Sequence, residues 1–239
     1  MFDDLKIRNK LILLMAGPII IVVLLSFLGS RSRSEAADES RNTERFVSSA
    51  RANSDVVDAL QPESLYSSAY VGSDREEWTD EVTEARAATD ALLAPALERL
   101  DDLPASGPDV ESTAQLAVGA ADKLGFYRES VDQGFRADQY YELVINYSEI
   151  QDTFLAVNTA IADALPDAQA AAELREARAL GSFKSALAIQ ASLVAGASEQ
   201  GSFGSERAYD AFTQARIDEE AELTLLTSLS DAERKGEVR

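Results

Sequence analysis

The sequence contains no histidine and no cysteine, and its basic residues are few beside its acidic ones. Without histidine or cysteine there can be no Ser-His-Asp triad, no cysteine nucleophile, no imidazole or thiolate metal site and no disulfide. The 239 residues include 22 Lys and Arg against 42 Asp and Glu, which gives a formal net charge of -20. Nucleic-acid binding depends on clustered Lys and Arg. We therefore expect no nucleic-acid partner and no cofactor.

The same composition argues against catalysis. Metal-dependent enzymes built in helical bundles use Glu-x-x-His motifs, which a chain without histidine cannot form. Paired carboxylates can serve glycoside hydrolysis, but a chain with 42 acidic residues brings such pairs together by chance. We predict that this chain is not an enzyme.

One long apolar run lies near the N-terminus. Residues 11–29, LILLMAGPIIIVVLLSFLG, carry no charge, and as a helix they would reach roughly 28 Å, close to the thickness of bilayer hydrocarbon. No Ala-x-Ala cleavage site follows the run, so we predict a retained transmembrane helix in the cell membrane rather than a cleaved signal peptide. Basic residues precede the run, which favours a cytoplasmic tail over 1–10 and an extracytoplasmic domain over 30–230.

The rest of the chain has the pattern of an all-α protein. Apolar residues recur at three- and four-residue steps, and Ala, Leu, Glu, Gln and Arg dominate. Glycines and prolines interrupt this pattern, and Pro62 is expected to bend the first helix. We predict an up-and-down bundle of about six long helices. Their expected ranges are 34–70, 75–100, 110–131, 137–165, 167–198 and 206–229.

Two features of the turns sharpen this prediction. Asp74 followed by Glu77 resembles a capping box, which would start the second helix at Arg75. Residues 61–93 and 188–223 both read as a helix, a Gly-Ser turn and an acidic helix. The bundle is therefore expected to contain two pseudo-repeated helical hairpins.

Several segments resemble the nitrate- and nitrite-sensing (NIT) domain family of bacterial membrane receptors. Residues 57–73, VDALQPESLYSSAYVGS, resemble the first signature of that family. The YYELVI segment over 140–145 is similar to the Tyr-Tyr-x-x-Leu-Ile step of its middle helix, and 182–212 resembles its second signature. The resemblance covers about 41–229. It implies an all-helical sensor, often held outside the membrane by a transmembrane helix, whose usual outputs are histidine kinases, chemoreceptors, cyclases or RNA-binding antiterminators.

The resemblance also implies where a ligand would bind. In that family an arginine from each signature helix is thought to hold the anion, because guanidinium offers paired planar donors to a planar oxyanion. Here the first arginine position falls on Ser64 and the second on Ala191. We expect the fold to be kept while nitrate binding is weak, lost or rebuilt from other donors. The nearest polar candidates are Gln61, Ser64, Lys184 and Gln190.

The leading hypothesis from the sequence is therefore an extracytoplasmic sensor domain of a bacterial transmembrane signalling receptor. Its expected partners are the membrane, a second copy in a homodimer, and a small anion or another small ligand. On this hypothesis residues 231–239 form a tail that leads to a second span in a longer protein. The alternative is a membrane-anchored helical bundle that binds another protein and has no small ligand.

Overall fold

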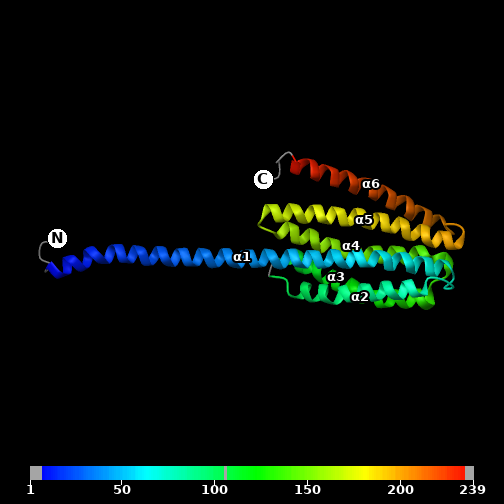
Figure 1. Ribbon diagram of the computed structural model, residues 1–239, viewed down its shortest axis with the longest axis horizontal. Helices are drawn as coiled ribbons and strands as arrows, with labels where there is room; N and C mark the ends of the chain where they lie inside the picture. The colour runs from blue at the N-terminus through cyan, green and yellow to red at the C-terminus, as the bar shows by residue number, and fades with distance from the viewer. Residues whose placement is uncertain (1–6, 105–106, 235–239) are drawn as a thin grey trace. The chain divides into compact units, whose positions relative to one another are not determined.

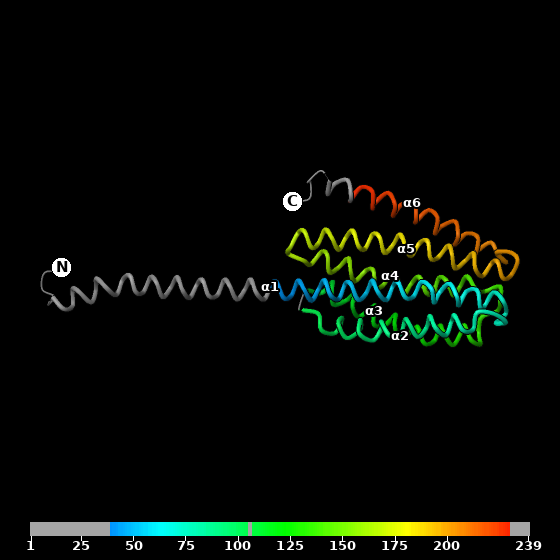
Figure 2. Tube along the Cα trace, viewed as in Figure 1, coloured from blue at the N-terminus to red at the C-terminus, as the bar shows by residue number. Residues whose placement is uncertain are grey.

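The computed structural model describes residues 39–104 and 107–229 in full. Figure 2 shows these residues in colour. The chain divides into two compact units, Met1–Glu44 and Arg45–Arg239. The predicted transmembrane run 11–29 and the tails 1–10 and 231–239 lie outside the fully described residues. Within those residues no helix is long and apolar enough to cross a membrane.

The prediction of an all-α bundle is confirmed: the described elements are six long helices and two short helical turns, with no strand among them (Figure 1). A π-helical turn over Ser130–Gly134 and a 3₁₀ turn over Ala137–Gln139 connect the third helix to the fourth. The six helices are α1 (Ile7–Gly72), α2 (Thr79–Asp101), α3 (Pro108–Glu129), α4 (Tyr140–Ala164), α5 (Ala168–Gln200) and α6 (Glu206–Arg234).

Local signals set several of these boundaries. The Asp167 carboxylate caps α5 by accepting hydrogen bonds from the backbone N–H groups of Gln169 and Ala170, at 2.9 and 3.0 Å. Gly201, with φ of 75°, ends the same helix in the left-handed conformation that glycine adopts without strain. Pro62 does not interrupt α1. It lies on the exposed face, where water can satisfy the carbonyl that has lost its helical partner.

The second helix begins at Thr79, four residues later than the capping signal predicts. Asp74, Arg75 and Trp78 all have positive φ, between 56° and 72°, which is uncommon for residues other than glycine. Long-range contacts hold this turn. Arg75 Nε donates to the Val131 carbonyl at 2.9 Å, while Trp78 stacks on Tyr66 with ring centroids 6.0 Å apart. These contacts outweigh the local capping preference.

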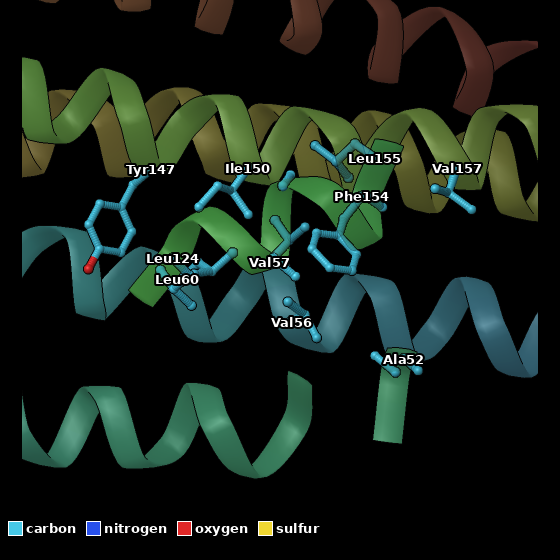
Figure 3. Close-up of a cluster of buried hydrophobic side chains, with 14 of the residues drawn as sticks. Ala52, Val56, Val57, Leu60, Leu124, Tyr147, Ile150, Phe154, Leu155 and Val157 are labelled. Atoms are coloured by element: carbon cyan, nitrogen blue, oxygen red, sulfur yellow. The ribbon is translucent and has the colours of Figure 1, made fainter. Parts of the chain in front are cut away.

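In the second unit the helices run side by side, and the turns after α1, α3 and α5 lie at one end of the bundle (Figure 1). An apolar stripe along α4 forms the centre of the core, between α1, α3 and α5 (Figure 3). Tyr140, Tyr147 and Phe154 from this stripe are fully buried. Burial of each such side chain stabilises the fold by roughly 1.5–3 kcal/mol.

Helices α1 and α5 run parallel and approach closely. Ser68 Oγ donates to the Ser192 carbonyl at 2.7 Å, and an added Cβ on Gly72 would lie 2.6 Å from the Gly196 carbonyl oxygen. Only residues without a side chain allow the two backbones to come this near. We call this contact surface the α1–α5 seam.

Candidate functional site

Two of the four predicted site residues, Gln61 and Ser64, precede Ser68 by seven and four residues and therefore lie on the same face of α1, the face that meets α5 at the α1–α5 seam. Ser64 is 3% exposed. The Gln61 side-chain nitrogen is buried and has no hydrogen-bond partner. Buried polar groups are normally paired, so these two residues mark a polar position in the interior of the bundle.

The other two predicted residues, Lys184 and Gln190, lie on α5 but do not complete an anion site. Lys184 forms an ion pair with Asp58 of α1, so its charge is already balanced at the exposed edge of the seam. Gln190 Nε2 donates to Glu219 Oε2 of α6 at 2.8 Å and therefore faces α6 rather than α1. The structure thus brings Gln61, Ser64 and Lys184 to one helix pair and leaves Gln190 on another face of α5.

The two positions where the family resemblance expects arginine differ in their surroundings. Ser64 faces the interior, whereas Ala191 is exposed on α5. The next residue, Ser192, is fully buried against α1, and its hydroxyl oxygen has no hydrogen-bond partner. Among the described residues, the polar groups buried along this seam are neutral apart from Glu63.

Glu63 forms a buried ion pair that sequence reasoning missed. Its side chain, on α1, is fully buried. The carboxylate accepts two hydrogen bonds from Arg128 of α3: Nε donates to Oε1 at 2.8 Å, and Nη2 donates to Oε2 at 3.0 Å. The Tyr147 hydroxyl of α4 donates to the same Oε1 at 2.7 Å, and Figure 3 shows this side chain pointing from α4 toward α1. Arg128 also donates to Asp90 of α2 at 2.7 Å. We call these four residues the Glu63 cluster.

The Glu63 cluster joins α1, α2, α3 and α4 directly beside Ser64. Burial by itself would lower the pKa of Arg128, but hydrogen bonding to Glu63 and Asp90 more than offsets this effect and raises that pKa. Burial raises the pKa of Tyr147 well above its ordinary value, and the Glu63 carboxylate adds to the shift. Both donors therefore stay protonated at neutral pH. The cluster fixes side chains in place and offers no group poised for catalysis.

No signal in the sequence pairs Glu63 with Arg128, because the two residues are 65 positions apart. The available hint is the place of Glu63 on the inward face of α1, between the buried residues Leu60 and Ser67. A charged residue on such a face is almost always paired.

The described elements form an all-helical bundle, and comparison with known proteins gives the family. A family model for nitrate and nitrite sensing matches residues 55–239. The chain therefore belongs to the nitrate- and nitrite-sensing (NIT) family, as the resemblance of its signatures predicts.

The fold is similar to that of a solved structure, the NasR transcription antiterminator, with a TM-score of 0.74 and 18% sequence identity. The match covers 86% of this chain and 55% of that protein, so this chain spans about half the length of its structural relative. No curated protein matches the sequence.

Proposed function

We propose that the chain is the extracytoplasmic sensor domain of a membrane-anchored bacterial signalling receptor of the histidine-kinase or chemoreceptor type, in which arginine no longer holds nitrate. Membership of a nitrate- and nitrite-sensing family supports the sensory role. The observation that carries the proposal is the burial of Ser64, a neutral side chain, at the position of α1 where the family resemblance expects a guanidinium group.

The energetics oppose tight nitrate binding at this seam. An anion moved from water into the bundle loses its hydration and needs a cation or several hydrogen bonds in return. The cations near this position are already paired, Lys184 with Asp58 and Arg128 with Glu63, and Glu63 places a carboxylate next to Ser64. The net charge of -20 further lowers the local concentration of anions.

Titration calorimetry of the full chain in detergent with nitrate and nitrite tests this proposal, with chloride at equal ionic strength as the control. We expect no saturable heat at micromolar ligand. Micromolar binding of nitrate, but not of chloride, would show that the seam has kept an anion site.

The membrane anchor is a separate part of the proposal. Alkaline phosphatase fused after residue 229 should be active, since this enzyme matures only outside the cytoplasm, and deletion of residues 11–29 should abolish the activity. Inactive fusions with the run intact would place the domain in the cytoplasm and contradict the proposed orientation.

The exposed face of α5 supports the proposed homodimer, and also favours the second candidate function, a protein-interaction module. Leu180, Leu187 and Val194 recur every seven residues and are 40–49% exposed. A seven-residue repeat of apolar residues is typical of helices that pair along their length. A second copy of the chain would cover this stripe with the same stripe in parallel.

The absence of cysteine allows a direct test of this dimer. A single Leu187→Cys substitution should form a disulfide-linked dimer under mild oxidation, because a parallel pair places both copies of residue 187 together. Leu116→Cys, at an exposed leucine of α3, is the matched control. Equal cross-linking of both variants would show that the disulfides form in random collisions, and would contradict the proposed dimer.

A further inference from the structure

A groove runs along the outer face of α4, away from the α1–α5 seam. It has a volume of about 820 Å³, within the range of about 300–1,000 Å³ found for small-molecule sites. Its floor is formed by α4, where Ala156 and Ala160 keep the surface low, and its walls are formed by the start of α3 and by α5. We call this the α4 groove.

Arg178 of α5 lines the α4 groove with an incomplete set of partners. Its Nη1 atom lies 3.7 Å from Glu222 Oε1 of α6, a distance that is too long for a hydrogen bond. The Arg178 Nε and the Glu222 Oε2 are both buried, and neither has a hydrogen-bond partner. The two side chains as a whole are 35% and 21% exposed, and a ligand that accepts a hydrogen bond from the guanidinium would add a partner for Arg178.

The lining of the groove also contains Asp152 of α4, whose carboxylate interacts with the charge of Arg178. Burial raises the pKa of Asp152, the charge of Arg178 lowers it by less, and the carboxylates of Asp218 and Glu149 raise it further. The Asp152 carboxylate therefore faces the positive charge of Arg178 as well as the negative charges of Asp218 and Glu149. At the other end Asp163 is already paired with Arg175, Nη2 to Oδ1 at 2.9 Å, and about 16 Å of helix separates the two aspartates. The end of the groove that can accept a ligand is therefore the end that contains Arg178 and Asp152.

These charges restrict the class of ligand. A simple anion would meet Arg178 but also Asp152 and the negative field of the domain. A simple cation would meet Asp152 but be repelled by Arg178. A molecule with both charges, separated by one carbon atom, can satisfy both groups and remain neutral overall. The apolar floor, with Leu155 and Ala156, can take an aliphatic side chain.

We infer that the α4 groove binds a free α-amino acid with an aliphatic or small side chain, with its carboxylate on Arg178 and its ammonium on Asp152. Hydroxyl groups of Ser182 and Thr159 lie in the same lining and can complete the hydrogen bonds. This site is distinct from the α1–α5 seam, so the sensor domain would respond to an amino acid whether or not the seam binds an anion.

The test is calorimetric titration of the full chain in detergent with each proteinogenic L-amino acid at millimolar concentration. We expect a subset with aliphatic or small side chains to bind. For the best of them, the amine that lacks the carboxylate and the carboxylic acid that lacks the ammonium should each bind at least about tenfold more weakly, since each loses a charge-assisted hydrogen bond. Failure of every amino acid to bind, or equal binding of either analogue, would overturn the inference.

Variants place the ligand in the groove. Arg178→Gln should weaken binding at least about tenfold, whereas Arg216→Gln, at an exposed arginine of α6, should leave it unchanged. Ala156→Phe fills the floor from an exposed position and should abolish binding, and Ala221→Phe on the exposed face of α6 is its control. Unchanged binding in both Arg178→Gln and Ala156→Phe would exclude the groove.

Discussion

Substitution of Glu63 by alanine should destabilise the second unit more than any change on its surface. The variant leaves the Tyr147 hydroxyl buried without an acceptor and removes two of the hydrogen bonds of Arg128. Loss of one member of a buried ion pair costs about 3–5 kcal/mol. Arg128 keeps Asp90, and its side chain is 17% exposed, so we expect the lower end, about 3–4 kcal/mol.

Urea unfolding of the full chain in detergent, followed by far-UV circular dichroism, measures this loss. In thermal melts, at about 2–4 °C per kcal/mol for a domain of this size, the melting temperature should fall by roughly 6–16 °C. Asp132→Ala breaks the more exposed Arg86–Asp132 pair and should cost less than about 1 kcal/mol.

A combined variant separates the penalty of an unpaired charge from the value of the pair. Glu63→Leu with Arg128→Met and Tyr147→Phe removes both charges of the ion pair and the Tyr147 hydroxyl, and leaves only the exposed carboxylate of Asp90. Apolar replacement of buried ion pairs is often neutral or stabilising. It should be more stable than Glu63→Ala alone. A loss of less than about 1 kcal/mol in the free energy of unfolding of Glu63→Ala would contradict this expectation, because the cluster would then stabilise the fold no more than a surface ion pair does.

Three further predictions concern packing and pH. Gly196→Ala should cost about 1–3 kcal/mol, since the new Cβ would lie 2.6 Å from Tyr140 Cγ, whereas Gly119→Ala, which meets open space on α3, should stabilise by about 0.5–1 kcal/mol; urea unfolding compares the two. Stability should be flat from about pH 6 to 9, because no histidine titrates there. Above this range stability should fall, since burial raises the pKa of Tyr140 to about 12. The contribution of Tyr140 to the free energy of unfolding is complete below the unfolded pKa of about 10 and is lost as the pH rises through about 12. In thermal melts Tyr140→Phe should make that decline less steep. Asp152→Asn should raise the melting temperature at pH 7, because a raised aspartate pKa means that the charged form disfavours folding, and the gain should vanish below about pH 3.9.

The helices could be predicted because their signals are local. The stripe that holds Tyr140, Tyr147 and Phe154 has helical spacing, and the same residues are buried in the structure. The start of α2 could not be predicted, because Arg75 and Trp78 are held by partners that lie far along the chain. Local preference alone would have started that helix earlier.

The candidate site could be predicted only in part, for the same reason. The family signatures pointed to Ser64 as the first arginine position, and in the structure this side chain is buried on α1. Spacing within α5 could not tell that Ala191 is exposed and its neighbour Ser192 buried, since the rotation of a helix is set by its contacts. The Glu63 cluster and the α4 groove depend on pairs between helices, and a single sequence does not reveal these pairs.

The chain has the fold of a nitrate- and nitrite-sensing domain, and we propose that its α1–α5 seam lacks a cation that could hold the anion. Calorimetric titration of the full chain with nitrate, against chloride at equal ionic strength, tests this proposal. We expect no saturable heat at micromolar nitrate. A saturable, nitrate-specific heat with a micromolar dissociation constant would contradict this expectation.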